Sequence, residues 1–236
     1  MDFSLTTENI ATLLIDGSTI FLLLGVLIQT SIMRKRGRKE DKLFFGLILL
    51  TMVVAVADIV TYLADEKHFP GARILNLGGV TVFYMALILS VMGLFHYCVI
   101  RFGGIFDEQP KLERLLLLPG AVIELLLLIN LFTGLIFYVD ESNVYHYGIL
   151  FISMFIIMGV YLLSGLIVMG RYRSKNDNAV LIPVWIFLLP IMAGLVVPFV
   201  IGGISLTSIG LAMSVVFIHA GSASEIVNYE TEEKSA

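Results

Sequence analysis

The residues of this chain that could do chemistry are a few acidic side chains set inside long apolar segments. Asp58 and Glu124 each interrupt a run of aliphatic residues, and Asp16 stands near the start of a third run. An ionisable side chain in hydrocarbon costs at least a few kcal/mol, so each is by default a candidate site. The chemistry open to such carboxyl groups is proton exchange, cation binding or ligand recognition.

Asp58 belongs to a polar stripe on its segment. At about 100° per residue, the members of this stripe fall within about 60° of one another on a helix. They are Thr51, Asp58, Tyr62 and Asp65. A stripe that opens toward the outside fits a water-filled ligand pocket. The alternative is that Asp58 accepts hydrogen bonds from neighbouring helices and holds the bundle together.

Glu124 has no Lys or Arg in any apolar segment to pair with. It is therefore expected either to be protonated and donate a hydrogen bond, or to face a hydrated cavity. Asn130 lies six residues further on, which turns it about 120° away, so the two do not share a helix face. Asp16 is expected simply to reach the membrane interface.

Tyrosines near the same end of the segments complete the candidate set. The candidate ligand-binding residues are Asp58, Tyr62, Tyr84, Glu124, Asn130, Tyr138 and Tyr145.

Several kinds of chemistry have no supporting residues. No lysine occurs within an apolar segment, so a retinal Schiff base cannot form. The sequence has no His-Glu-x-x-His zinc motif and no Gly-x-Ser-x-Gly nucleophile motif. Cys98 is the single cysteine, which excludes an internal disulfide framework and a cysteine-based zinc cluster. We expect no catalytic residue, no metal site and no cofactor, and the chain is not expected to be an enzyme.

The composition identifies the elements that must position these side chains. Of the 236 residues, 58% are hydrophobic and 14% charged, and the mean hydropathy is +0.95. In a soluble domain, roughly a quarter of the residues are charged. These values indicate a polytopic membrane protein and exclude a soluble globular protein, a disordered tail and a nucleic-acid binder with a basic face.

Apolar segments of membrane-spanning length divide the chain. A spanning helix needs about 20 mostly apolar residues. From Asn178 to Ser224, 47 residues carry no acidic or basic side chain apart from His219, about twice that length, so this stretch is expected to fold back at Gly202-Gly203. The fold class predicted is an all-α seven-transmembrane helix bundle in residues 1–224. The spans are about 10–33, 43–63, 74–100, 115–139, 148–170, 179–201 and 204–223.

The basic residues set the orientation. With the N-terminus outside, the inner segments hold 13 of the 15 Lys and Arg residues, and the outer segments hold only Lys67 and Arg73. The positive-inside rule therefore predicts an outer N-terminus and a cytoplasmic C-terminus, with residues 225–236 as a cytoplasmic tail.

The outer segment between the fourth and fifth spans has the pattern of a hairpin. Aromatic and β-branched residues flank the polar turn Asp140 to Asn143, which predicts a short extracellular β-hairpin at 136–147. The alternative is a belt of interfacial tyrosines that anchors the helix ends.

The last two spans carry residues that shape helix packing. The sixth span contains three prolines, which kink membrane helices: Pro183, Pro190 and Pro198. The seventh has small residues spaced by four, three and four, which allow close helix approach: Gly203, Thr207, Gly210 and Ser214. These spans are expected to differ between two signalling arrangements.

Two stretches resemble the bacterial N-terminal seven-helix sensor region that precedes histidine kinase and diguanylate cyclase domains. The first is Asp41-Lys42-Leu43-Phe44-Phe45 with the later Thr51 and Asp58, and it is similar to that family's second span. The second and more specific stretch runs from Asn130 to Asp140 and on through Asn143-Val144-Tyr145-His146. The family often has Pro after the Asn and Gly after the turn Asn, where this chain has Leu131 and Val144.

The resemblance implies an extracytoplasmic sensor that signals through the seventh helix to a cytoplasmic kinase or cyclase output, in cis or in trans, in the bacterial inner membrane. By the same analogy the protein is a homodimer. The expected partners are membrane lipids and a small-molecule, peptide or lipid ligand of unknown identity, with no nucleic acid. Two alternatives stay open. One is a small transporter or channel component using Asp58 and Glu124, and the other is an accessory protein whose polar residues only hold helices together.

Overall fold

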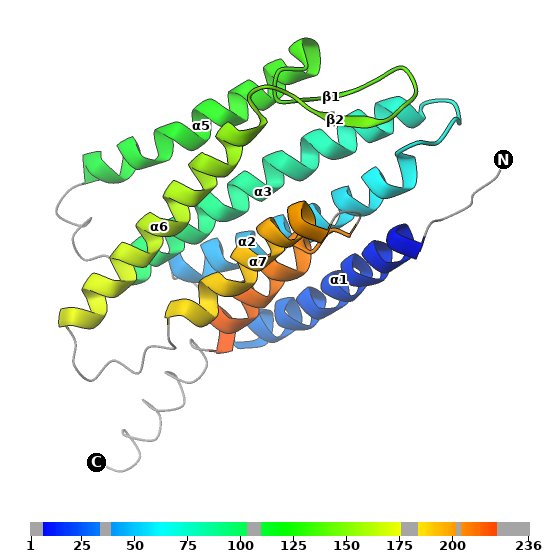
Figure 1. Ribbon diagram of the computed structural model, residues 1–236. Coiled ribbons are helices and arrows are strands. Elements are labelled where there is room, and N and C mark those ends of the chain that lie inside the picture. The colour runs from blue at the N-terminus through cyan, green and yellow to red at the C-terminus, as the bar shows by residue number, and fades with distance from the viewer. Residues whose placement is uncertain (1–6, 34–38, 103–109, 176–183, 202–203, 221–236) are drawn as a thin grey trace.

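The computed structural model describes residues 7–33, 39–102, 110–175, 184–201 and 204–220. These residues form seven helices and one two-stranded sheet, whose arrangement can be followed in Figure 1. The elements are α1 (Thr7–Met33), α2 (Lys39–Ala64), α3 (Ala72–Phe102), α5 (Pro110–Thr133), β1 (Phe137–Val139), β2 (Tyr145–Tyr147), α6 (Phe151–Lys175), α7 (Val184–Ile201) and a last helix, Thr207–Ala220.

Five helices of the described chain are long and apolar enough to cross a membrane, namely α1, α2, α3, α5 and α6. Their outward faces carry bare apolar side chains, such as Phe21 and Ile32 on α1, each 80% exposed. Such a surface is stable in lipid and would be costly in water. The chain is thus a helical multi-pass membrane protein, while the count of seven spans and the orientation stay predictions.

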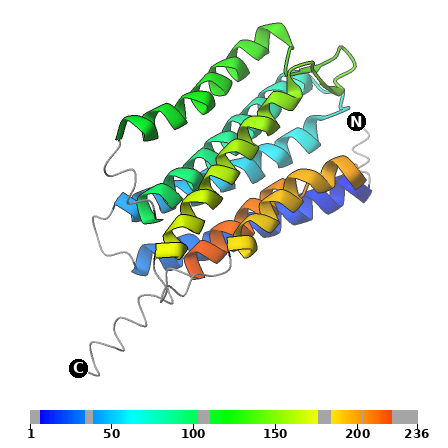
Figure 2. The same ribbon diagram turned by 60° about the vertical axis from the view of Figure 1, so that its left-hand side comes forward.

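Helix α3 lies at the centre of the bundle, because it packs against α2, α5 and α6. Figures 1 and 2 both show α1, α7 and the last helix on one side of the α2–α3 pair and α5 on the other. Leu47 and Ile48 of α2, Leu87 and Ile88 of α3 and Met154 of α6 are at most 2% exposed. These five residues belong to one buried hydrophobic core, which α2, α3 and α6 share.

The fourth predicted span is shorter than expected. The prediction extended it to residue 139, but α5 ends at Thr133 and residues 137–139 form β1. Gly134 has a φ of 64°, the left-handed region that glycine adopts at the end of a helix, and its N–H donates to the Asn130 carbonyl at 2.9 Å. The glycine therefore ends the helix six residues before the predicted boundary of the span.

The predicted β-hairpin at 136–147 is confirmed. Strands β1 and β2 pair antiparallel with Phe137 opposite Tyr147 and Val139 opposite Tyr145. The turn is closed by the Asn143 N–H donating to the Asp140 carbonyl at 3.1 Å, and Asn143 itself has a φ of 62°. Aspartate and asparagine favour these turn positions, which is why the sequence pattern was informative. That the hairpin is extracellular stays a prediction.

Helix α7 and the last helix run in opposite directions and cross at two glycines. A β-carbon on Gly194 would lie 2.6 Å from the Leu206 carbonyl oxygen, and one on Gly210 would overlap the Pro190 carbonyl oxygen. Thr207 Oγ1 also donates to the Gly194 carbonyl at 3.1 Å. The close approach predicted for Thr207 and Gly210 is therefore present. The predicted turn at Gly202-Gly203 lies outside the described residues.

Candidate functional site

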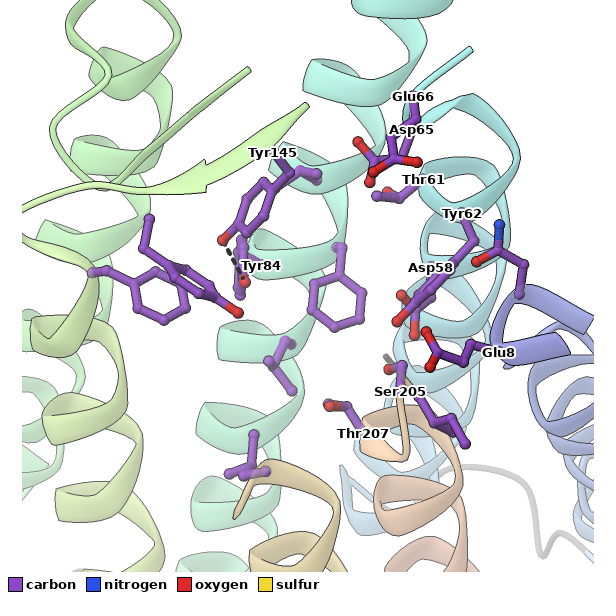
Figure 3. Close-up of a pocket in the computed structure, with 18 of the residues that line it drawn as sticks. Glu8, Asp58, Thr61, Tyr62, Asp65, Glu66, Tyr84, Tyr145, Ser205 and Thr207 are labelled. Atoms are coloured by element: carbon purple, nitrogen blue, oxygen red, sulfur yellow. Dashed lines mark hydrogen bonds between the residues drawn. The ribbon is translucent and has the colours of Figure 1, made fainter. Parts of the chain in front are cut away.

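A cavity of about 510 Å³ lies at the end of the bundle that carries the hairpin. Figure 3 shows it between the C-terminal part of α2, the N-terminal part of α3, the strand β2 and the segment that leads into the last helix. Its lining residues come from every described element except α5 and β1. They are Glu8, Asn9, Asp58, Thr61, Tyr62, Asp65, Glu66, Val80, Phe83, Tyr84, Leu87, Tyr145, Tyr147, Phe151, Phe155, Leu195, Ile204, Ser205 and Thr207.

The acidic side of the cavity is built around Asp58. Its side chain is only 5% exposed, and it takes part in a hydrogen bond with Ser205. Its other oxygen, Oδ2, is buried and has no hydrogen-bond partner. A buried polar atom without a partner is costly, so Asp58 has one acceptor position available to an occupant of the cavity.

A polar network behind Asp58 joins three helices. Thr12 of α1 accepts a hydrogen bond from the Ser205 backbone N–H at 3.3 Å and also interacts with Tyr62 of α2. Ser208 of the last helix donates to Asp16 Oδ1, and Asp16 is fully buried. The expectation that Asp16 merely reaches the membrane interface is wrong, because the last helix covers it. The network ties the position of the last helix to α1 and α2.

The opposite wall of the cavity is aromatic. The hydroxyl oxygens of Tyr84 on α3 and Tyr145 on β2 lie 3.0 Å apart and share a hydrogen bond, drawn as a dashed line in Figure 3. The Tyr84 ring contacts Phe151 edge-on with centroids 5.8 Å apart. Burial raises the pKa of Tyr145, so its phenol is neutral and serves as a hydrogen-bonding group. The hairpin therefore forms part of the wall itself.

The rim of the cavity is acidic. Glu8 and Glu66 are exposed, and Asp65 accepts a hydrogen bond from the Asn76 amide at 2.8 Å. Burial raises the pKa of Asp65, and the Asn76 bond partly offsets this effect. None of the described lining residues is Lys, Arg or His. Nearby Arg73 is directed elsewhere and donates to the Val139 carbonyl at 3.0 Å.

Asn143 fastens the hairpin to the helices that form the cavity. Its side-chain amide donates to the Ala64 carbonyl at 2.6 Å and to the Lys67 carbonyl at 3.0 Å. Its backbone carbonyl accepts from the Glu66 N–H at 3.0 Å. Asn76 of α3 is 3.2 Å from the same carbonyl. The turn residue thus connects the hairpin with the end of α2 and the start of α3.

Toward the other end of the bundle, Thr30 of α1 shares a hydrogen bond with His219 of the last helix, while three other hydroxyl groups donate to carbonyls of their own helices. Thr51 donates to the Leu47 carbonyl, Ser90 to the Ala86 carbonyl and Ser214 to the Gly210 carbonyl. These hydroxyls lie among buried aliphatic side chains of α2, α3 and the last helix. None of these three residues lines the cavity.

The structure brings together four of the seven candidate residues. Asp58, Tyr62, Tyr84 and Tyr145 line the cavity. Thr51, which the sequence placed on the same stripe as Asp58, does not line it.

Three candidates lie elsewhere. Both oxygens of Glu124, on α5, are buried without a hydrogen-bond partner and are not part of the cavity. Asn130 holds the start of the hairpin, because it accepts from the Ile136 N–H at 2.6 Å and donates to the Phe137 carbonyl at 2.8 Å. Tyr138 is 46% exposed and stacks on His146 with ring centroids 5.1 Å apart.

Several lining residues were not among the candidates from the sequence, including Glu8, Ser205 and Thr207, of which Thr207 was expected only to serve helix packing. Glu8, Ser205 and Thr207 each lie at the end of a helix or in a connection. The spans were recognised only by their lack of charged residues, which says nothing about polar residues at these ends. The preference of Ser and Thr for positions before and at helix starts was the signal that could have indicated Ser205 and Thr207.

Among the described residues, no group of three His, Cys, Asp or Glu side chains lies close enough to hold a metal ion. Comparisons with protein-family models, with curated proteins and with solved structures found no match to this chain. The functional argument therefore depends on the geometry of the cavity.

Proposed function

We propose that this protein is a membrane receptor or sensor module that binds a ligand in the cavity beside Asp58 and signals through the last helix. The observation that carries the proposal is the composition of the cavity wall. Ser205 and Thr207, at the start of the last helix, line the same cavity as Asp58 of α2 and Tyr145 of the hairpin. An occupant therefore contacts the last helix directly.

Signalling requires that the ligand has a different affinity for two arrangements of the helices. We expect the contacts at Ser205 and in the Thr12 network to differ between an empty and a filled cavity, because a ligand group that bonds the unpartnered Oδ2 acts on the same carboxyl group that bonds Ser205. The last helix then transmits the change along its axis. The glycine crossing of Gly194 and Gly210 couples α7 to the same movement.

The sequence supports the proposed orientation and the proposed output. The basic residues favour an N-terminus outside, which puts the cavity and the hairpin on the extracytoplasmic side of the bacterial inner membrane. The resemblance to sensor regions favours seven spans and a histidine kinase or diguanylate cyclase output, acting as a homodimer. The output is in cis or in trans.

A transporter or channel component is the second candidate. Asp16 and Asp58 are buried acids with an unpartnered oxygen each, and both oxygens of Glu124 are unpartnered. Proton-coupled transporters use such groups. Thr51, Ser90 and Ser214 do not line the cavity, and this favours the receptor, since a permeation path needs polar groups that face it along the bundle.

Reconstitution in liposomes separates the two functions. The full chain is placed in vesicles containing a pH-sensitive dye, and a proton gradient with a potassium diffusion potential is imposed. We expect a proton flux equal to that of empty vesicles, for the native chain and for Asp58→Asn and Glu124→Gln alike. A flux above the empty vesicles that falls in either variant would contradict the receptor proposal and support transport.

A further inference from the structure

The cavity separates its chemistry into two halves. Figure 3 shows Glu8, Asp58, Asp65 and Glu66 on the side formed by α1 and α2, and Tyr84 and Tyr145 on the opposite side. The complete set of aromatic lining residues is Tyr62, Phe83, Tyr84, Tyr145, Tyr147, Phe151 and Phe155. An occupant therefore meets the acidic side chains, with Tyr62 beside Asp58, at one end and the rings of Tyr84 and Tyr145 at the other.

The negative charge of the lining has no balancing positive side chain among the described lining residues. A group of acids in a cleft with low-dielectric walls raises the local concentration of cations. The exposed carboxylates of Glu8 and Glu66 are placed to attract a cation at the rim. Asp58, 5% exposed and with Oδ2 unpartnered, is placed to receive it at depth.

The aromatic residues favour an organic cation over an inorganic one. Ring faces attract ammonium groups through their quadrupole, and aromatic walls are the usual site for quaternary and substituted amines. A hydrated metal ion gains little from seven aromatic side chains, and no triad of metal-binding side chains is present in the described residues. The cavity, at about 510 Å³, is also within the range of sites for small organic ligands.

We infer that the cavity binds an organic cation: an amine, protonated or quaternary, that carries an apolar or aromatic body. Its ammonium group bonds or pairs with Asp58 near Ser205, and its body packs between α3, α6 and the Tyr84–Tyr145 pair. The inference rests on the proposed receptor function and names the class of ligand for the same cavity. It also accounts for the lack of Lys, Arg and His among the described residues that line the cavity, because the ligand supplies the positive charge.

Three soluble probes with one body and different heads test the inference. They are 2-phenylethylammonium, 2-phenylethanol and phenylacetate, titrated by calorimetry into the full chain in lipid nanodiscs, with protein-free nanodiscs as the blank. We expect the cation to bind at least tenfold more tightly than the alcohol, and the anion not to bind. The inference would be overturned if the alcohol or the anion bound as tightly as the cation. It would also be overturned if none of the three bound at about 10 mM, a concentration that detects even weak binding.

Two sets of variants locate the binding. Asp58→Asn is expected to weaken binding of the cation at least tenfold and to leave binding of the alcohol unchanged. The matched control is Glu124→Gln, which neutralises a buried carboxyl outside the cavity and is expected to leave cation binding unchanged.

Because Asp58→Asn could also disturb folding, a second variant changes only the exposed rim. The double variant Glu8→Gln and Glu66→Gln is expected to weaken cation binding by about threefold or more. Equal binding by the native chain and the rim variant would contradict the charge argument.

Failure of this inference and failure of the receptor proposal give different results. A cation that binds with no Asp58-dependent flux in liposomes supports both. A cation that binds together with such a flux keeps the ligand class and removes the receptor. Absence of cation binding without flux removes the ligand class and leaves the receptor.

Discussion

At the scale of single residues, the molecule is organised around polar side chains that bridge elements distant in sequence. Asn143 joins the hairpin to α2 and α3, and Asp16 and Ser208 join α1 to the last helix. In an apolar environment, a polar group that lost such a bond would be left without a partner, at a cost in free energy. A few polar residues therefore suffice to hold these elements together.

Replacement of Asn143 tests this view at one position. Asn143→Ala removes the bonds to the Ala64 and Lys67 carbonyls and places alanine, which adopts the left-handed region less readily than asparagine, at a φ of 62°. We expect the free energy of unfolding to fall by about 2–4 kcal/mol, from lost bonds and backbone strain. Asn143→Gly keeps the backbone and should cost about 1 kcal/mol less. Equilibrium denaturation in mixed micelles measures both.

The exposed neighbour Ser142 gives the control. Ser142→Ala is expected to change the free energy of unfolding by less than about 0.5 kcal/mol. If Asn143→Ala had an equally small effect, the amide would not be the fastening point of the hairpin.

Asp140 gives the turn a dependence on pH. The Val144 backbone N–H, which donates to its carboxylate at 2.9 Å, and the His146 ring lower the pKa of Asp140 below its usual value. Because the folded-state pKa is the lower one, the stabilisation is complete above the unfolded value of about 3.8. It is lost as the pH falls through the folded-state pKa.

Amide hydrogen exchange at Val144 reports this loss. We expect protection to be constant from neutral pH to about pH 4 and to decrease below it, after correction for intrinsic exchange. In Asp140→Asn the decrease should be absent. A decrease of equal size in that variant would mean that another group titrates.

The cavity was only partly predictable at this scale. Asp58 and Tyr62 could be recognised because they lie on one face of a single segment. The approach of Glu8 and Ser205 to Asp58 could not be predicted, because it depends on how α1 and the last helix pack against α2. The same packing explains why Asp16 is buried although its position near the start of α1 indicated the interface.

At the scale of elements, helix ends and close crossings decide the shape of the bundle. The first, second, third and fifth predicted spans correspond to α1, α2, α3 and α6 within a few residues, because charge clusters border them. The fourth did not, since hydrophobicity continues past Thr133 through Phe137 and Val139. Glycine at 134 and the Asn130 amide end the helix where hydropathy gives no sign.

The crossing of α7 with the last helix depends on glycine at two positions. Gly210→Ala places a methyl group against the Pro190 carbonyl oxygen, so one helix must shift. We expect the free energy of unfolding to fall by about 1–3 kcal/mol, the usual cost of overpacking. Thermal unfolding in detergent measures the loss as a lower Tm.

The matched control is Gly159→Ala on α6, where a β-carbon meets nothing within 4 Å. This change should leave the Tm unchanged or raise it, because alanine favours a helix. A Gly210→Ala protein as stable as Gly159→Ala would show that the crossing tolerates a wider spacing.

At the scale of the whole molecule, the cavity lies at the end of the bundle that holds the hairpin and the start of the last helix. The positive-inside rule predicts that this end faces away from the cytoplasm. Single cysteines in a Cys98→Ala background test the orientation with a membrane-impermeant maleimide. We expect Ser142→Cys to react in intact cells and Lys42→Cys to react only after the membrane is permeabilised. The reverse pattern would put the cavity on the cytoplasmic side.

The coupling of the cavity to the last helix is the central claim, and a tethered occupant tests it without a known ligand. Glu8→Cys, at the rim, is labelled with benzyl methanethiosulfonate in the Cys98→Ala background. Ile149→Cys, 83% exposed and outside the cavity, is the control site. Amide hydrogen exchange of residues 204–212 is then compared with that of α5.

We predict that labelling at position 8 slows exchange in residues 204–212 at least threefold, because the benzyl group fills the space into which these amides open. Exchange in α5 should not change, and labelling at position 149 should affect neither segment. Unchanged exchange in residues 204–212, with complete labelling of position 8 confirmed by mass, would contradict the receptor account.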